Sequence, residues 1–415
     1  MKRILILGGG FAGVETFRRL HKQLHPAGKH NVELQLINRT NYFTFSPMLH
    51  EVATGAVTRE QVVQPLREIL ACCGKDFHQA SVKQVDLARN VVVTDSGEHP
   101  YDILVVTLGV EQGFFGVAGA AENALALKWL PGALNIRNRI INSFEKASEM
   151  QDRHDTAGVR RFLRFLIIGG GATGTELAGQ ISDLVVHEMR SFYGDVPQSL
   201  CSLELIHAGQ RLLEVLSPTA SIKVQRRLEN LGVDVRLNAR VVEVGKDFVK
   251  LATGEKVESN NIFWTAGTES TLPGILPKEV LTERGLAMIE PTFQLTGHEH
   301  VFVLGDCAQI QDKAYAFPPT AQAAVQAARI TAKNILAQLN EKPLVKKKYK
   351  TKGDIIPIGN WWGLYEKKFL RVTGVGSWIL RRIVFLKTMY GWTNRIEVAF
   401  TWLVALVLPR DTSEF

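Results

Sequence analysis

The sequence predicts an α/β protein with two parallel-sheet domains, the second inserted in the first, and a C-terminal amphipathic region. Two glycine-rich motifs lead to this prediction. Gly8 to Gly13 follows the apolar segment 3–7, and Gly169 to Gly174 follows the apolar segment 165–168. A predicted helix comes after each motif, so each has the strand, glycine turn and helix of a Rossmann-type unit. The chain has 415 residues, too many for one ordinary core.

The first domain opens with a βαβ element, and a later strand is expected to return to its sheet. The final helix of this domain is expected to begin after Thr320, a credible N-cap. Its predicted elements are strand 3–8, helix 12–25, strand 32–37, alternating segments near 76–86 and 90–94, strand 103–106, strand 301–304 and a helix from 321 to about 339.

The second domain repeats the βαβ pattern after a long helix. A helix there is expected to end at Leu231-Gly232, a plausible C-cap. The predicted elements are helix 121–149, strand 163–168, helix 173–192, strand 203–206, helix 218–230 and short strands with a Thr253-Gly254 turn over 233–264. The expected domains are therefore 1–115 with 290–340, then 116–289, and a C-terminal region 341–415.

Glycines in such turns let the backbone approach a pyrophosphate, and the N–H groups that begin the following helix face the phosphates. Two motifs in one chain indicate two bound dinucleotides, as in proteins where a flavin accepts a hydride from a nicotinamide. The alternative is a pair of glycine-rich turns without a ligand.

The four cysteines, Cys72, Cys73, Cys201 and Cys307, contain no C-x-x-C pair. Nothing in their spacing indicates a disulfide framework or a metal site, and their use fits a reducing compartment. We expect Cys307 to be a small buried hydrophobic residue.

The C-terminal region carries the excess charge. Residues 341–415 contain 14 Lys and Arg against 6 Asp and Glu, and five of the seven tryptophans. This composition indicates a membrane surface. Nucleic acid is the rival partner, but the aromatics lie among Ile, Leu and Val rather than in a polar groove, so none is expected.

Two amphipathic segments, 378–387 and 395–408, lie within this region. The apolar run 398–408 is well short of the roughly 20 residues that span a bilayer. We therefore expect the tail to lie in the membrane interface, with Arg and Lys at the headgroups and Trp and Leu inserted. The alternative is a helix docked on the body or in a dimer interface.

Further motifs make nearly the whole chain resemble the type II NADH:quinone dehydrogenases, single-chain FAD enzymes of the membrane surface. The most specific motif is Pro319 to Gln326, whose helix separates the flavin from the quinone pocket in that family. The others are Gly8 to Gly13, Asn41 to Leu49, His50 to Gly55, Phe115 to Val117, Gly169 to Gly179, Trp264 to Gly267 and Gly305 to Ala308.

The resemblance and the glycine motifs together assign the site residues, with no metal site among them. Asp306 resembles the aspartate that hydrogen-bonds the FAD ribityl chain. The expected FAD-binding residues are Gly8, Gly10, Ala12, Gly13, Asn38, Arg39, Val82, Thr107, Gly109, Gly305, Asp306, Ala321 and Gln322. The expected NADH-binding residues are Gly169, Gly171, Gly174, Glu176, His207, Ala266 and Gly267.

Three residues are expected to act in catalysis. The resemblance implies that Glu176 lies near the nicotinamide and helps to relay a proton, although a glutamate in a first helical turn also complements the helix dipole. Gln322 and Gln326 are four residues apart and share one helix face. Their amides can donate to and accept from a quinone or the flavin, and the alternative is an exposed polar pair.

Two positions depart from the usual pattern. An Asp or Glu after the second strand of each nucleotide unit normally binds the ribose hydroxyls, but this chain has Asn38 and His207 there. Histidine lacks the charge that repels the 2′-phosphate of NADPH, and Arg211 is nearby. We therefore expect weaker discrimination between NADH and NADPH than usual, unless backbone groups select NADH.

The resemblance implies hydride transfer from NADH to FAD and then transfer of two electrons to a membrane quinone, without proton pumping. It also implies a homodimer that pairs through the C-terminal region. Because the chain begins on a predicted strand, no signal peptide is expected, which favours a peripheral position on the cytoplasmic face of the cell membrane. The alternatives are a sulfide:quinone oxidoreductase or an NADH-sensing flavoprotein with little turnover; a disulfide reductase would need a redox cysteine pair.

Overall fold

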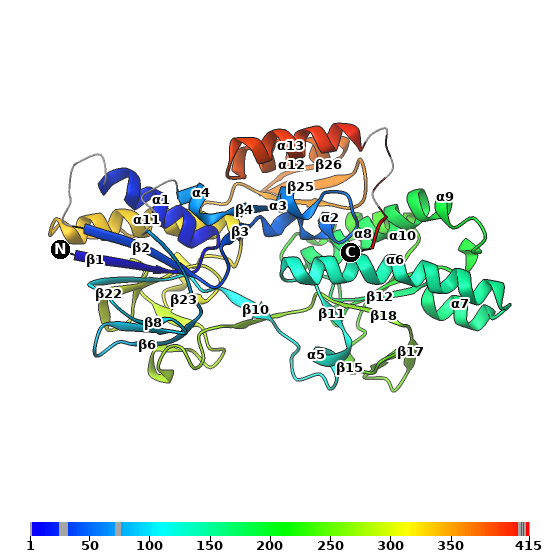
Figure 1. The fold of residues 1–415 in the computed structure, drawn as a ribbon, viewed down its shortest axis with the longest axis horizontal. Coiled ribbons are helices and arrows are strands. Elements are labelled where there is room, and N and C mark those ends of the chain that lie inside the picture. The colour runs from blue at the N-terminus through cyan, green and yellow to red at the C-terminus, as the bar shows by residue number, and fades with distance from the viewer. Residues whose placement is uncertain are drawn as a thin grey trace. The chain divides into compact units, whose positions relative to one another are not determined.

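The computed structural model describes residues 2–24, 32–70, 76–405, 408, 410 and 412–414, so Cys72 and Cys73 lie outside the described residues. The chain forms two compact units (Figure 1). Unit 1 contains Met1–Thr44, Val63–Glu111 and Glu269–Thr351. Unit 2 contains Phe45–Val62, Gln112–Thr268 and Lys352–Phe415. The predicted insertion of one α/β unit into another is therefore present.

Unit 1 is built on an eight-stranded sheet in the order β23-β20-β21-β22-β9-β1-β2-β5. The strands β22, β9, β1, β2 and β5 run parallel, and the expected return of the strand near 301–304 is confirmed by the pairing of β22 with β9. Their bounds are β1 Lys2–Leu7, β2 Val32–Asn38, β5 Phe77–Gln79, β9 Ile103–Val106, β20 Ala287–Ile289, β21 Gln294–Leu295, β22 His298–Val303 and β23 Ala308–Ile310.

Two long helices of unit 1 pack against each other, α1 (Phe11–Leu24) and α11 (Ala321–Leu339). The predicted N-cap of α11 is confirmed, because the Thr320 side chain accepts a hydrogen bond from the Ala323 N–H at 3.2 Å. Further elements of unit 1 are β3 Tyr42–Thr44, β4 Val63–Pro65, α4 Leu66–Leu70, β6 Val82–Asp86, β7 Val91–Thr94, β8 Gly97–Pro100 and the short helices Lys278–Val280 and Lys313–Tyr315.

Unit 2 contains a five-stranded parallel sheet in the order β11-β18-β12-β13-β14. Its second βαβ element and the helix α10 (Pro218–Asn230) agree with the prediction, and Leu231 is the C-cap of α10. The strands are β11 Leu125–Ala126, β12 Arg164–Ile168, β13 Ser202–Ile206, β14 Val233–Arg236 and β18 Asn261–Trp264; an antiparallel sheet adds β15 Val241–Val244, β16 Phe248–Leu251 and β17 Lys256–Glu258.

Two predicted helices of unit 2 are wrong in detail. The helix expected at 121–149 is instead α5 (Ala120–Asn123), the short strand β11 and then α6 (Leu130–Asp152), because Pro131 sits in the first turn of a new helix. The helix expected at 173–192 is α8 (Ala172–Asp183) followed by the π-helical turn Leu184–Met189 and α9 (Arg190–Phe192). Other short elements are α2 Leu49–Val52, α3 Arg59–Val62, α7 Thr156–Phe162 and the 3-10 helices Ser46–Met48 and Gln198–Leu200.

The C-terminal region contains a three-stranded antiparallel sheet that the sequence did not predict. It comprises β24 (Asp354–Pro357), β25 (Gly363–Lys367) and β26 (Leu370–Gly374). The two predicted amphipathic segments form α12 (Val375–Thr388) and α13 (Trp392–Val404), which lie side by side near this sheet (Figure 1). No helix in the described part of the chain is long and apolar enough to cross a membrane.

The two units divide the chain at different positions from the expected domains. Residues 45–62 belong to unit 2, because α2 packs against α6 and α8. Residues 269–289 belong to unit 1, where β20 pairs with β21 and β23. Residues 352–415 belong to unit 2, because β24 packs on α8 and α13 on α3. Of the five points where the chain passes from one unit to the other, two lie within β10 (Val110–Gln112) and β19 (Thr268–Ser270).

Candidate active site

The first glycine turn joins β1 to α1 at the carboxyl end of the unit 1 sheet. Gly8 has a φ of +101°, which favours glycine, and its N–H donates to the carbonyl of Ile37 at 2.8 Å. A Cβ atom on Gly13 would overlap the carbonyl oxygen of Gly8, so glycine there lets the helix begin against the strand. Thr107, after β9, holds the same carbonyl with its hydroxyl at 3.0 Å.

The second glycine turn, between β12 and α8, repeats this geometry in unit 2. Gly169 has a φ of +121° and donates to the carbonyl of Ile206 at 2.9 Å. A Cβ on Gly174 would overlap the carbonyl oxygen of Gly169, and the Thr265 hydroxyl donates to that oxygen at 3.2 Å. The two turns therefore have matching geometry, and each follows a parallel strand of its sheet, β1 in unit 1 and β12 in unit 2.

Both turns keep open space in front of the helix N-terminus. A Cβ atom on Gly10 or Gly171 would have no neighbour within 4 Å in the described chain, so packing does not require glycine there. The N–H groups of the first helical turn and the positive end of the helix dipole make this space a site for an anion. The construction fits the pyrophosphate of a dinucleotide at each turn.

Unit 1 brings most of the expected FAD residues to one edge of its sheet. The strands β22, β9, β1 and β2 are neighbours, and these residues follow their carboxyl ends: Gly305 and Asp306, Thr107 and Gly109, Gly8 to Gly13, and Asn38 and Arg39. Val82 begins β6, and Ala80 before it donates to the carbonyl of Asn38 at 3.0 Å. Ala321 and Gln322 form the first turn of α11.

Two of the expected ligands already have partners in unit 1. The Gln326 amide binds the backbone of Lys350 through both of its ends, at 3.0 and 3.2 Å. Arg39 forms an ion pair with Glu111 at 2.8 Å. A ligand that used either side chain would have to break these interactions.

Unit 2 gathers the expected NADH residues in the same manner. Ala266 and Gly267 follow β18, Gly169 to Gly174 follows β12, and His207 follows β13, on three adjacent strands. The carbonyls of Ala266 and Gly267 each accept a hydrogen bond from Gln112 at 2.8 Å. Glu176 is the fifth residue of α8, so it lies just beyond the first turn, where the sequence analysis expected it, and that turn contains no acidic residue.

Glu176 belongs to a charge cluster of four residues in unit 2: itself, with a side chain that is 15% exposed, and the buried His50, Glu51 and Arg381. Arg381 of α12 donates to Glu51 at 2.6 Å and to His50 Nε2 at 3.2 Å. Because a guanidinium only donates, Nε2 accepts and the neutral ring carries its hydrogen on Nδ1. That Nδ1 lies 3.4 Å from Glu176 Oε2. Trp402 of α13 donates to the second oxygen of Glu51 at 3.2 Å.

The charge cluster holds its two carboxyl groups in different protonation states. Burial raises the pKa of Glu176 to about 8, the charge of Arg381 opposes this and the charge of Glu51 adds to it. Burial also acts to raise the pKa of Glu51, but Arg381 lowers it to about 2. Burial and Arg381 lower the pKa of His50 to about 3. At neutral pH Glu51 is ionised, Glu176 is protonated and His50 is neutral.

Comparison with known proteins agrees with this arrangement. Residues 2–328 match the family described as pyridine nucleotide-disulphide oxidoreductase. The chain is 30% identical to the type II NADH:quinone oxidoreductase of Haemophilus influenzae, over 88% of this chain and 86% of that protein. This chain belongs to the type II NADH:quinone oxidoreductases.

Other members of the family match nearly the full chain. The type II NADH:quinone oxidoreductase Ndh of Mycobacterium tuberculosis is 28% identical over 98% of this chain and 89% of its own length. The structure of NDH2 from Plasmodium falciparum in complex with NADH superposes with a TM-score of 0.90, at 19% identity, and covers 99% of both chains. The fold is therefore shared along the whole length.

The sequence analysis missed the partners of Glu176 in this type II NADH:quinone oxidoreductase. His50 and Glu51 were noted only as part of a family motif, and Arg381 was expected at lipid headgroups. That expectation is wrong for Arg381, because its guanidinium is buried and neutralises the charge of the Glu51 carboxylate. It is also wrong for Trp378 and Trp402, which are buried and stack on Arg382 with guanidinium-to-ring distances of 3.8 and 4.4 Å.

The described cysteines do not form a redox site in this oxidoreductase. Burial raises the pKa of the Cys307 thiol and of the Cys201 thiol to about 12, so both are protonated at neutral pH. Cys307 is wholly buried, which agrees with its expected role as a small hydrophobic residue. Chemistry that begins from a thiolate is therefore disfavoured at these two positions.

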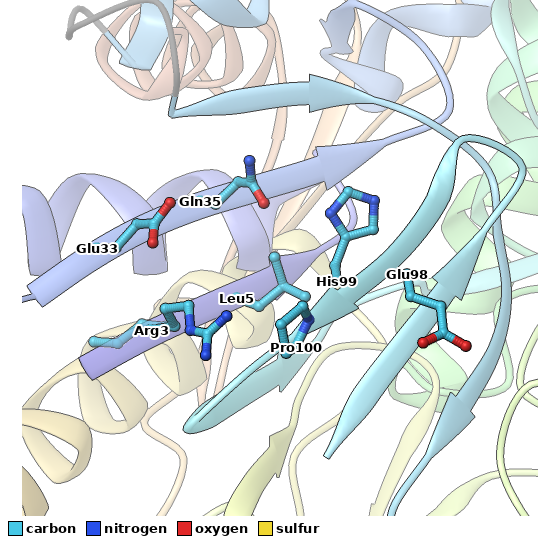
Figure 2. Close-up of a pocket in the computed structure, with 8 residues that line it drawn as sticks. Arg3, Leu5, Glu33, Gln35, Glu98, His99 and Pro100 are labelled. Carbon is cyan, nitrogen blue, oxygen red and sulfur yellow. The ribbon is translucent and has the colours of Figure 1, made fainter. Parts of the chain in front are cut away.

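Unit 1 also contains a cavity of about 240 Å³ away from its glycine turn. Figure 2 shows that it is lined by the first half of β1 and β2 and by β8. Ligands of such sheets bind at the carboxyl ends of the strands, so this cavity is not the dinucleotide site of unit 1. Its lining residues are Arg3, Ile4, Leu5, Glu33, Gln35, Glu98, His99 and Pro100.

Proposed function

We propose that this chain oxidises NADH and passes two electrons through FAD to a quinone. The observation that carries the proposal is the pair of matching glycine turns, each open in front of a helix N-terminus. Bound FAD supplies the redox chemistry, since it accepts a hydride from NADH and gives electrons to a quinone. The two protonated thiols disfavour the sulfide:quinone alternative.

Each unit holds one dinucleotide in this proposal. Unit 1 binds FAD along the carboxyl ends of β22, β9, β1 and β2, with the pyrophosphate at the N-terminus of α1. Unit 2 binds NADH along β18, β12 and β13, with the pyrophosphate at the N-terminus of α8. Backbone N–H groups fixed by the turns recognise both pyrophosphates without a change in the fold.

Glu176 provides a proton in this reaction. A quinone that receives two electrons takes up two protons, and at neutral pH the Glu176 carboxyl carries one because burial raises its pKa to about 8. His50 Nδ1 lies 3.4 Å from this carboxyl, and Arg381 fixes the tautomer of His50 by donating to its Nε2. Glu51 balances the charge of Arg381.

The proposed partner of the C-terminal region is a lipid surface, on the cytoplasmic face of the cell membrane. Spaced by four residues, Val375, Ile379 and Ile383 are exposed along α12. The hairpin between β25 and β26 adds a fully exposed Phe369 after Lys367 and Lys368. A second exposed apolar row follows α13: Trp392, Ile396, Phe400 and Leu403. Exposed apolar rows beside basic residues are typical of interfacial helices.

The membrane proposal is tested by co-sedimentation of the full chain with anionic and neutral lipid vesicles. The variant Ile396→Ser with Phe400→Ser is expected to lose about tenfold or more in vesicle affinity. Ile222→Ser, an equally exposed apolar residue on α10, is the matched control and should bind as the unchanged chain does. If the apolar rows instead mediate the proposed homodimer, the double variant becomes monomeric in detergent and still binds vesicles.

The activity is tested by NADH oxidation with detergent-purified protein, with and without a soluble short-chain quinone. Fast oxidation that depends on the quinone supports the proposal. A long-lived reduced flavin with every quinone would support the NADH-sensing alternative instead. Quinone reduction driven by sulfide rather than NADH would also contradict it.

A further inference from the structure

His207 occupies the position after β13 whose residue normally binds the adenosine ribose, but in this chain its ring is hydrogen-bonded to the glycine turn instead. His207 accepts a hydrogen bond from the Gly170 N–H through Nδ1 at 3.1 Å. Asn38 does the same for the Gly9 N–H in unit 1, at 2.8 Å. Both residues therefore hold the middle of a glycine turn.

The His207 ring is neutral in this role. Its Nδ1 accepts, so Nε2 carries the hydrogen. Nε2 is covered and has no hydrogen-bond partner among the described residues. Burial lowers the pKa of His207, and the charge of Glu214 acts to raise it. The ring gives neither a negative charge for the ribose hydroxyls nor a positive charge for a 2′-phosphate.

Arg211 is also committed within its own loop. Its guanidinium donates to the carbonyl of Leu216 at 2.7 Å, to the hydroxyl of Ser221 at 2.8 Å and to the carbonyl of Glu214. These three bonds use both terminal nitrogens and tie residues 211–221 together. A 2′-phosphate of NADPH could bind Arg211 only if these hydrogen bonds broke. Arg211 is therefore not available as the cation that would favour NADPH.

Glu214 places a carboxylate at the end of β13. A Cβ atom on Gly209 would overlap Glu214 Oε1 and would lie 2.7 Å from His207 Nε2. The Glu214 carboxylate therefore lies against the Cα atom of Gly209, next to the His207 ring. Glu214 is exposed, and its carboxylate forms no hydrogen bond or ion pair with any residue that the structure describes. It has the charge that His207 lacks, at the strand end where the ribose is bound.

The loop backbone directs Glu214 to this place. The Leu213 N–H donates to the carbonyl of Gly170 at 2.8 Å, which fixes the loop on the glycine turn. Leu213 has a φ of +50°, a conformation that costs a non-glycine residue about 1 kcal/mol. The fold thus accepts backbone strain at the residue before Glu214.

We propose that Glu214 recognises the adenosine ribose of NADH and excludes NADPH. The carboxylate accepts hydrogen bonds from the ribose hydroxyls, and it repels the charge of a 2′-phosphate. The inference rests on the proposed function, because it assigns a residue to the NADH site of unit 2. It replaces the expectation that His207 and Arg211 weaken the discrimination between the two coenzymes.

The test compares kcat/KM for NADH and NADPH in the full chain and in Glu214→Gln, with a short-chain quinone as acceptor. The unchanged chain should prefer NADH by about a hundredfold or more. Glu214→Gln should reduce that preference about tenfold or more, through a higher NADH KM and a higher kcat/KM for NADPH, with kcat for NADH nearly unchanged. Glu229→Gln, an exposed glutamate on α10, is the control.

A second variant and a binding measurement keep the test independent of turnover. Gly209→Ala displaces the Glu214 carboxylate and should change the preference in the same direction, with a somewhat lower melting temperature because the added methyl group also presses on the His207 ring. Calorimetric titration with NAD⁺ and NADP⁺ should show the same order of affinities, even if the quinone reaction is absent. An equal preference for NADH in Glu214→Gln and the unchanged chain, or a preference for NADPH in the latter, would overturn the inference.

Discussion

The side chains of the two glutamates of the charge cluster are 5% and 15% exposed, for Glu51 and Glu176 respectively, yet only one is ionised at neutral pH. Glu51 shares a 2.6 Å hydrogen bond with Arg381, whereas Glu176 meets the neutral His50 ring at 3.4 Å. Burial raises the pKa of a carboxyl unless a close cation compensates for the lost solvation. The close Arg381 cation, with a smaller contribution from Arg382, therefore keeps Glu51 ionised and leaves Glu176 as an acid.

The first residue-scale prediction concerns the pH profile of NADH:quinone turnover. Because the pKa of Glu176 is raised to about 8, activity should fall as pH rises through about 8 and the carboxyl loses its proton. Glu176→Gln should lower turnover at neutral pH by about a hundredfold and remove this alkaline limb. Steady-state rates from acidic to alkaline pH check this, with Glu229→Gln as control. An alkaline limb that persists in Glu176→Gln would exclude the acid role.

A second prediction concerns the buried ion pair. Arg381→Met leaves the buried Glu51 carboxylate without the cation that hydrogen-bonds to it, which should reduce the free energy of unfolding by about 3–5 kcal/mol. Glu51→Gln combined with Arg381→Met should cost clearly less than the sum of the single changes. Denaturant unfolding measures this, and Lys146→Met, which breaks an exposed pair with Glu149, should change it by less than about 1 kcal/mol. Additive effects would show that the pair is not coupled.

At the scale of elements, the two βαβ units could be predicted because their signals are local. Apolar strands, glycine turns and amphipathic helices all lie within about 35 residues of sequence. The sheet β24 to β26 could not, because its stability comes from pairing and from packing on α8 and α12. The start of α6 could have been predicted from Pro131, because proline is common in the first turn of a helix.

The site was predictable to the same extent. The glycines and Glu176 were identified from the sequence, but the bonds from Gly9 to Asn38 and from Gly170 to His207 depend on three-dimensional geometry. Arg381 lies 331 residues from His50, so only the fold reveals that they meet. Long-range charge pairs of this kind leave no periodic pattern in a sequence.

The element-scale prediction distinguishes a glycine needed for binding, Gly171, from a glycine needed for folding, Gly174. Gly171→Ala places a methyl group in open space at a φ of −79°, so the protein should fold normally and its NADH KM should rise about tenfold. Gly174→Ala forces the helix away from Gly169 and should lower the melting temperature by several degrees. Kinetics and thermal unfolding check both. A Gly171→Ala variant with unchanged KM would place the pyrophosphate elsewhere.

At the scale of the whole molecule, tryptophan fluorescence reports the unfolding of one unit only. All seven lie in unit 2: Trp129, Trp264, Trp361, Trp362, Trp378, Trp392 and Trp402. The charge cluster lies in the same unit, and its residues come from three separate stretches of the chain, in α2, α8 and α12. Tryptophan fluorescence therefore follows the unfolding of the unit that the cluster connects.

The last prediction concerns the pH dependence of that unfolding. Glu51 has a folded-state pKa lowered to about 2, so its contribution is present above its ordinary value and is lost as pH falls toward 2. Glu176 has a folded-state pKa raised from 4.5 to about 8, so the folded chain binds the extra proton and loses stability as pH rises through this range.

Glu176→Gln carries no such proton, because its amide stays neutral. Relative to the unchanged chain, this variant should therefore become progressively more stable from about pH 5 to about pH 8, and the difference should stay constant above that. Denaturant unfolding followed by tryptophan fluorescence, with FAD in excess, measures the difference at each pH. A difference that does not change with pH would mean that Glu176 ionises in the folded protein as it does in water. The cluster would then lack the neutral acid that the proposed quinone reaction requires.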